Sequence, residues 1–163
     1  MNDILYSPWR LDYINSPKEE GCIFCLEESE KNDEKHLILF RGKLSFVIMN
    51  MYPYNNGHLM VVPNRHTNSI ISLSDAERND LFELVQCTVK IIEENYKPQG
   101  INIGMNIGKA AGAGIDEHIH VHIVPRWSGD VNFMTSIAAT RVIPEKFENV
   151  YHRLKELFDK LHV

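Results

Sequence analysis

The sequence lacks the features of disulfide-rich, membrane-spanning and exported proteins. It has only three cysteines among 163 residues, and a small, odd number of cysteines does not build a disulfide framework. It contains no run of about 18 apolar residues, the length that a membrane-spanning helix needs. The first twenty residues carry charges and two prolines without an apolar core, so we expect no signal peptide. Together these absences predict a cytoplasmic protein whose thiols stay reduced.

An excess of positive charge is also missing. Lys and Arg number 17 against 22 Asp and Glu, which gives a net charge of −5. Proteins that bind nucleic acid or anionic membranes without specificity need a cationic surface. We therefore expect no nucleic-acid partner and no membrane partner, although one nucleotide in a local site is compatible with this charge.

The length and composition predict a single folded domain over residues 1–163. Apolar residues make up 44% of the chain and charged residues 24%, both ordinary for a globular protein. A typical domain has roughly 150 residues, and no internal repeat, low-complexity tract or linker interrupts this chain.

Hydrophobic patterns predict five strands. Apolar stretches bounded by turn residues, or alternating with polar residues, occur at 36–40, 44–50, 58–62, 100–107 and 118–124. In the fourth stretch, Ile101, Ile103, Met105 and Ile107 share one face, which predicts a half-buried strand.

Two further stretches predict helices. Ser74 and Glu77 form a capping box, and the helix behind it should stop near Lys97, because Pro98 disfavours helical geometry in the residue before it. A last helix, from about 144 to 162, begins with Pro144 in its first turn. With short connections between the strands, this order predicts an α+β fold: a mainly antiparallel sheet of about five strands, with both helices on one face.

The most informative segment is His118-Ile119-His120-Val121-His122-Ile123-Val124. Side chains alternate between the two faces of a strand, so the three histidines share one face and the apolar residues enter the core. Three neighbouring imidazoles must be solvated, hydrogen-bonded or bound to something. The interpretations are an exposed polar face, a metal site that uses all three, and nucleophilic catalysis at phosphorus. Ligands at alternate positions of one flat strand diverge, which favours catalysis over the three-histidine metal site.

A glycine-rich stretch, 106–114, leads directly into the histidine strand. Glycines let backbone N–H groups turn toward an anion. The stretch matches no phosphate-loop signature, so by itself it is equally consistent with a flexible hairpin loop. Beside three histidines, an anion cradle is the better interpretation.

HIHVHIV resembles the histidine triad motif, in which three histidines alternate with apolar residues. The segment from Asn50 to Pro63, with its Gly57-His58 pair, is similar to the upstream strand–turn–strand of that family, and Asn106-x-Gly108 matches the segment before the triad. The resemblance covers about residues 22–135 and implies a histidine triad fold. SPWRLDYI near the N-terminus and PRWSGDVNF after the triad resemble the branch that contains diadenosine tetraphosphate phosphorylases and hydrolases.

The resemblance implies an enzyme that cleaves at the α-phosphate of dinucleoside polyphosphates through a covalent nucleotidyl-histidine. His120 would be the nucleophile, with His118, His122 and His58 around it. The implied nucleotide-binding residues are Asn50 for the ribose, Phe24 and Ile48 for a purine base, and Asn106, Gly112, Ala113 and Gly114 for the phosphate.

Several functional alternatives remain at this point. The same pocket would also suit a non-catalytic nucleotide-binding module. Family members often carry a Ser or Thr just before the triad, whereas Gly112–Ile115 has no hydroxyl; a nucleoside phosphoramidase, which would use that hydroxyl, is therefore the less favoured alternative. A divalent cation can accompany a polyphosphate substrate, and water or inorganic phosphate can be the acceptor.

The pair Cys22 and Cys25 has the spacing with which two thiolates share one tetrahedral ion. Two free cysteines are the alternative, and a redox motif would need a βαβ pattern that is missing here. Zinc-containing histidine triad proteins resemble this pattern, which implies a structural zinc ion held by Cys22, Cys25, His66 and His118. The family also implies a symmetric homodimer, with the helix that starts at Ser74 as the expected interface element.

Overall fold

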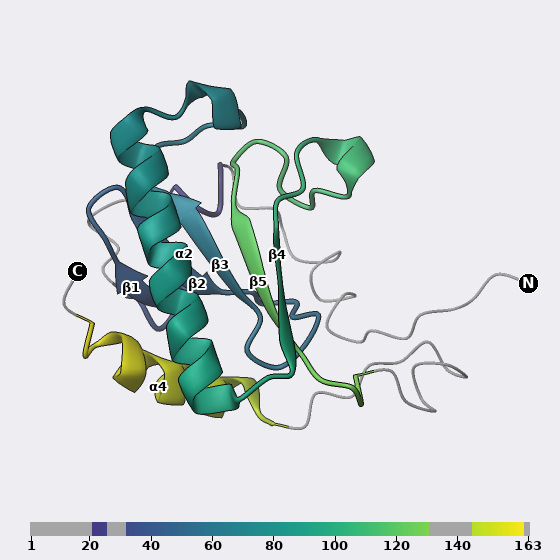
Figure 1. Ribbon diagram of the computed structural model, residues 1–163. Coiled ribbons are helices and arrows are strands. Elements are labelled where there is room, and N and C mark those ends of the chain that lie inside the picture. Colours follow the sequence, from purple (N-terminus) through teal and green to yellow (C-terminus); the bar gives the residue numbers. More distant parts are fainter. Residues whose placement is uncertain (1–20, 26–31, 131–144, 162–163) are drawn as a thin grey trace, which may run out of the picture.

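The computed structural model describes residues 21–25, 32–130 and 145–161. Its centre is one five-stranded sheet in which every neighbouring pair is antiparallel (Figure 1). Across the sheet the strands are β1 (Ile38–Arg41), β2 (Ser45–Met49), β3 (Leu59–Pro63), β5 (Val121–Arg126) and β4 (Gly100–Gly104). The predicted antiparallel sheet of about five strands is confirmed.

Of the two α-helices in the described residues, the first begins and ends where local sequence signals place it. In α2 (Asp75–Tyr96), Ser74 and Glu77 form the capping box, and Lys97 closes the helix in the left-handed region with φ 45°. The last helix, α4 (Phe147–Phe158), is shorter than the predicted 144–162. Pro144 lies outside the described residues. The described residues also contain two short 3₁₀ turns, η1 (Ile70–Ser72) and η2 (Lys109–Ala111).

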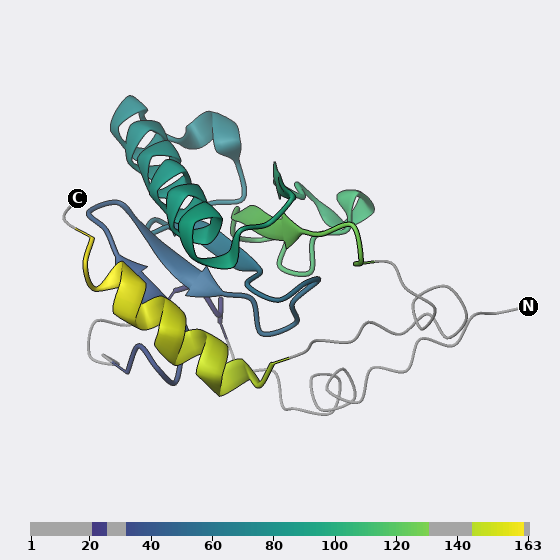
Figure 2. The same ribbon diagram turned by 60° about the horizontal axis from the view of Figure 1, so that its bottom comes forward.

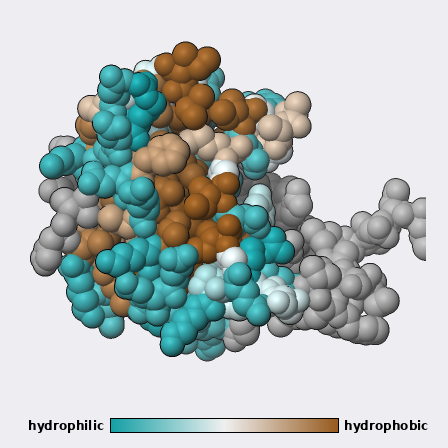
Figure 3. Space-filling view, viewed as in Figure 1, coloured by the Kyte–Doolittle hydropathy of each residue, from teal (hydrophilic) through white to brown (hydrophobic). Residues whose placement is uncertain are grey.

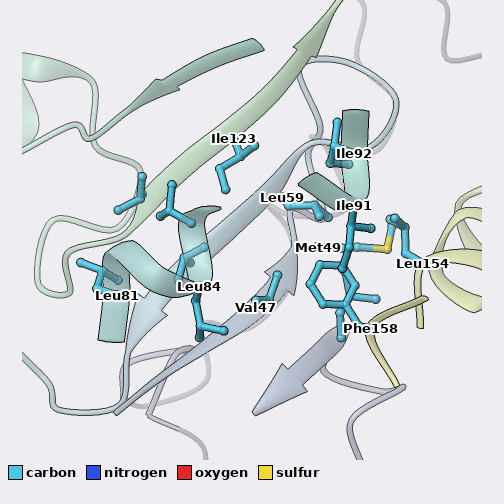
Figure 4. Close-up of a cluster of buried hydrophobic side chains, with 14 of the residues drawn as sticks. Val47, Met49, Leu59, Leu81, Leu84, Ile91, Ile92, Ile123, Leu154 and Phe158 are labelled. Carbon is cyan, nitrogen blue, oxygen red and sulfur yellow. The ribbon is translucent and has the colours of Figure 1, made fainter. Parts of the chain in front are cut away.

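Both helices pack on the same face of the sheet. Helix α2 lies along β2, β3 and β5, while α4 lies against β1, and Figure 2 shows the two helices beside each other over the strands. The main core fills this layer: Val47, Leu59 and Ile123 from the sheet meet Leu84 of α2 and Phe158 of α4 (Figure 4). Because burial of such side chains is the dominant stabilising contribution, this layer fixes the sheet as a rigid platform.

The opposite face of the sheet carries a smaller apolar cluster and the histidines. Register places Ile48, Met60 and His122 in one row across β2, β3 and β5. The residues of the smaller cluster are Phe24, Ile38, Phe46, Ile48, Met60 and Val62. The N-terminal segment that contains Phe24 therefore packs on this face of the sheet, next to the row of Ile48, Met60 and His122.

Strand β4 differs from the prediction. It ends at Gly104 rather than at residue 107, and Ile103 and Ile107 are 51% and 48% exposed. The reason is topological, because among the described residues β4 is at the edge of the sheet and pairs only with β5. Figure 3 shows apolar surface gathered on this side of the molecule, between α2 and the neighbouring strands. No helix in the described part of the chain has the length and apolar character needed to cross a membrane.

Candidate active site

The three triad histidines lie together with His58 on the face opposite the helices. Regular pairing of β5 begins only at Val121, so His118 and His120 precede the strand that was predicted to contain all three. His58, His118 and His120 are buried, with relative exposures of 1%, 0% and 5%. Ring centroids are 4.7 Å apart for His120 and His122, and 5.1 Å apart for His58 and His122.

The hydrogen bond of His120 defines which of its ring nitrogens can react. Nδ1 lies 2.9 Å from the backbone carbonyl oxygen of His118. A carbonyl only accepts hydrogen bonds, so Nδ1 carries the proton and donates it. Nε2 of the neutral ring then holds the lone pair, which makes it the nucleophilic atom.

The same reasoning orders the protons of His58 and His122. The backbone N–H of Tyr54 donates to Nδ1 of His58 over 3.0 Å, so the His58 proton is on Nε2. That Nε2–H donates to Nδ1 of His122, 3.0 Å away. The proton of neutral His122 is therefore on its Nε2, where it is a hydrogen-bond donor on the side of the ring away from His58.

Burial keeps these imidazoles neutral. Burial first, and then the neighbouring His122 and His120, lower the pKa of His58 to about 3. Burial, and then His120, lowers the pKa of His122 to about 4, and burial also lowers the pKa of His120. An imidazole must be neutral to act as a nucleophile, so the site is in its reactive protonation state at neutral pH.

Three of the seven predicted nucleotide-binding residues, Phe24, Ile48 and Asn50, lie beside this row. Phe24 is 3% exposed, and its ring centroid lies 5.2 Å from that of His120 and 5.6 Å from that of His118. Ile48 packs in the same apolar cluster as Phe24. The side-chain amide of Asn50 lies 3.3 Å from Nδ1 of His58, and its oxygen accepts the Tyr52 N–H.

The glycine-rich loop turns sharply before the triad. Gly112 has φ 88°, a conformation that glycine adopts without the strain of a Cβ atom. Ile115 packs against the apolar cluster of Phe24, which ties this loop to the histidine face. The N–H groups of Gly112 and Ala113 donate to the carbonyls of Lys109 and Gly108 over 3.0 and 3.4 Å. An anion here would compete with these bonds, so the phosphate roles of Asn106, Gly112, Ala113 and Gly114 stay predictions.

Four side chains from three separate parts of the chain form a second cluster. One donor atom from each of Cys22, Cys25, His66 and His118 lies within 4.8 Å of all the others. Cys25 Sγ is 3.1 Å from His66 Nδ1, and His118 Nδ1 is 3.4 Å from Cys22 Sγ and 3.7 Å from Cys25 Sγ. Tetrahedral zinc, with Zn–S and Zn–N bonds of about 2.3 and 2.05 Å, separates S and N ligands by about 3.5 Å. The donor set therefore fits one zinc ion.

The hydrogen bonds of His118 also suit metal binding. Its Nε2 donates to the backbone carbonyl of Pro63 over 2.9 Å, which leaves the Nδ1 lone pair directed at the cysteines. Metal-bound histidines are typically oriented in this way by a carbonyl or carboxylate. Partial burial, followed by the neighbouring Cys22 and Glu117, raises the pKa of the Cys25 thiol to about 11.

Some residues that shape the site carried no functional prediction. The N–H of Tyr54 and the carbonyl of Pro63 set two histidine tautomers, and Tyr54 also lays its ring 4.7 Å from that of His58. Asn55 and Asp130 hold the turn between β2 and β3. Hydrogen bonds of backbone groups cannot be predicted from the types of residue in a sequence. The turn-rich segment 52–57 before His58 did indicate a turn at this position.

The family model for the HIT domain matches residues 31–129. The chain therefore belongs to the histidine triad (HIT) family. A Mycobacterium tuberculosis protein named AP-4-A phosphorylase is 40% identical over 150 residues, which is 86% of this chain and 76% of that protein. A Schizosaccharomyces pombe protein named asymmetrical bis(5'-nucleosyl)-tetraphosphatase is 36% identical over 93 residues, 57% of this chain and 50% of that protein.

Solved structures of histidine triad proteins have a similar fold. A Zn-bound histidine triad family protein from Mycobacterium smegmatis has a TM-score of 0.61 at 25% identity, over 76% of this chain and 84% of that one. A hypothetical histidine triad nucleotide-binding protein from Sulfolobus tokodaii has a TM-score of 0.62 at 26% identity, over 84% and 89% of the two chains.

Proposed function

We propose that this chain cleaves dinucleoside polyphosphates at the α-phosphorus by nucleotidyl transfer to His120. The observation that carries the proposal is the hydrogen bond from His120 Nδ1 to the His118 carbonyl, 2.9 Å long. It directs the lone pair of a neutral imidazole to Nε2, as in-line attack on phosphorus requires.

The reaction has two balanced steps. In the first, Nε2 of His120 forms a bond to the α-phosphorus, and the bond from phosphorus to the bridging oxygen breaks. The leaving nucleotide departs with the electron pair on that oxygen. In the second step, water or inorganic phosphate attacks the α-phosphorus and the N–P bond breaks, which restores the neutral ring; an attacking water releases one proton to the solvent. Water yields a nucleoside monophosphate, and phosphate yields a nucleoside diphosphate.

His122 would stabilise the charge that develops during both steps. Its Nε2–H, fixed by the bond from His58, would donate to a phosphate oxygen, as donors in an oxyanion site do. Asn50 would contact the ribose, Phe24 and Ile48 the purine base, and the loop at 112–114 the polyphosphate. A divalent cation would enter with the substrate as its counterion.

The names of the relatives support this substrate class and leave two acceptors. The mycobacterial relative is named a phosphorylase and the yeast relative a tetraphosphatase. We expect the phosphorylase reaction, because the more similar of the two relatives bears that name and its similarity covers 86% of this chain.

Product analysis separates these possibilities. The protein is incubated with diadenosine tetraphosphate and magnesium, with and without inorganic phosphate, and the nucleotides are resolved by chromatography. ADP with ATP identifies phosphate as the acceptor, whereas AMP with ATP identifies water. Tight binding of the nucleotide without either product would instead favour a binding module and overturn the proposal.

We also propose one structural zinc ion per chain, held by Cys22, Cys25, His66 and His118. The donor distances of 3.1–3.7 Å support it, and four protein ligands close the coordination sphere, which is typical of a structural site. Thiolate ligands persist where thiols stay reduced, so the zinc site agrees with the cytoplasm as the predicted compartment.

We propose, finally, that two copies associate through the β4 edge and the neighbouring side of α2. Ile103, Ile107 and Phe82 are 51%, 48% and 62% exposed, and β4 is the last strand of the sheet. Unpaired edges and exposed apolar patches are commonly covered by symmetric association.

A further inference from the structure

A network of hydrogen bonds joins the turn that precedes His58 to the segment that follows the triad. The side-chain amide nitrogen of Asn55 donates to Asp130 Oδ2 over 2.7 Å and to the backbone carbonyl of Pro125 over 2.9 Å. An amide NH₂ has two protons, so both are used. Asn55 is thereby fixed to the end of β5, three residues beyond His122.

The Asp130 carboxylate is itself held firmly. Its Oδ2 accepts from Arg126 Nε over 2.7 Å and from the Trp127 N–H over 3.0 Å, in addition to Asn55. The Asp130 side chain is 11% exposed, so solvent competes little for these bonds. Three bonds on one oxygen leave Asp130 little freedom to move.

Asn55 in turn is linked to two backbone groups that help to orient His58. The backbone N–H of His58 donates to the backbone carbonyl of Asn55 over 3.1 Å, which closes the turn. The preceding residue, Tyr54, supplies the N–H that donates to His58 Nδ1 over 3.0 Å. A shift of Asn55 would therefore move the group that sets the tautomer of His58, and with it the donor proton of His122.

We propose that Asp130 is a positioning residue for the site, which acts through Asn55 to hold His58 as the Nε2–H tautomer that donates to His122. It touches neither histidine directly. The network runs from the end of β5 to the β2–β3 turn and back to β5 at His122. The segment after the triad therefore helps to decide which ring nitrogens of His58 and His122 carry the protons. This inference rests on the proposed function only for its kinetic readout.

The experiment compares Asp130→Ala and Asn55→Ala with Asp130→Asn, which keeps an acceptor oxygen for Asn55. In the alanine variants we expect kcat for diadenosine tetraphosphate to fall by about tenfold or more, since small misplacements of reacting groups cost such factors. KM should change by less than about threefold, because the network contacts neither Phe24 nor Ile48. In Asp130→Asn, kcat should recover to within about threefold of the wild type.

Long-range ¹H–¹⁵N NMR of the histidine rings provides a readout that needs no substrate. The wild type should show a protonated Nε2 and an accepting Nδ1 in His58, and the alanine variants should show an averaged tautomer. If the two residues act as one unit, the double variant should lose no more activity than either single variant. Asp33→Ala is the matched control, because Asp33 also pairs with an arginine, Arg41, at 2.9 Å on β1 away from the site.

A folded Asp130→Ala variant with kcat within twofold of the wild type and unchanged His58 ring signals would overturn the inference. If that variant does not fold, Asn55→Ala decides by the same criteria. If the wild type itself cleaves no dinucleoside polyphosphate, the proposed function fails, and the NMR signals alone then decide whether Asp130 positions His58.

Discussion

Acid should destabilise this protein through its buried histidines well before its carboxylates titrate. An imidazole in an unfolded chain titrates near pH 6.5, whereas His58 in the folded protein has a pKa of about 3 because burial disfavours its charged form. Below pH 6.5 the His58 imidazole binds a proton in the unfolded chain but stays neutral in the folded protein. The stability that depends on neutral His58 is therefore complete above pH 6.5 and is lost as the pH falls toward 3.

The size of the effect follows from the two pKa values. A pH of 5.0 is about 1.5 units below the pKa of the imidazole in the unfolded chain, and each unit corresponds to about 1.4 kcal/mol of unfolding free energy. His58 should thus lower the free energy of unfolding by about 2 kcal/mol between pH 7.5 and pH 5.0. His122, with a folded pKa of about 4, adds an effect of the same sign and similar size, against a total stability of roughly 5–15 kcal/mol for a domain.

The assay is urea unfolding of the wild type and of His58→Gln at both pH values, with zinc in excess. His58→Gln removes one titrating ring, so the wild type should lose about 2 kcal/mol more than the variant on acidification. This double difference cancels the direct cost of losing the His58 hydrogen bonds. His152→Gln, which removes a histidine on α4 whose side chain is 60% exposed, is the matched control and should behave as the wild type. A double difference below about 0.5 kcal/mol would refute the claim that His58 is buried neutral.

Three further outcomes are expected. His120→Asn should retain nucleotide binding by calorimetry and lose at least about 100-fold in kcat, because no other group can form the N–P bond; a smaller loss would exclude His120 as the nucleophile. Protein purified without chelator should contain about one zinc per chain by elemental analysis, and Cys22→Ser should lower both zinc content and thermal stability; less than about 0.2 zinc per chain would return the cysteines to free thiols. Light scattering at micromolar concentration should give the mass of a dimer, and Ile103→Lys should shift it toward the monomer by placing a charge in the apolar contact; a monomeric wild type would contradict the proposed association.

Features encoded by neighbouring residues were predictable from the sequence. The capping box at Ser74, the end of α2 before Pro98 and the turn-rich segment between the apolar stretches of β2 and β3 are local signals, and the structure has each of them. The family was also apparent, because the alternation of three histidines with four apolar residues is rare and specific. The strand over 100–107 was predicted too long and too buried, since a pattern shows which residues share a face and not whether anything covers that face.

What only the tertiary structure decided is where each proton and each donor atom lies. Cys22 and His118 are 96 residues apart, yet Sγ and Nδ1 approach to 3.4 Å, because the N-terminal segment crosses the histidine face. Whether His120 presents Nδ1 or Nε2 depends on the carbonyl of His118, and the tautomer of His58 depends on the N–H of Tyr54. The sequence by itself determined which histidines and cysteines were available and predicted which of them would carry the chemistry. Every residue has the same backbone groups, so only the fold could determine which ring nitrogen of each histidine is free to react.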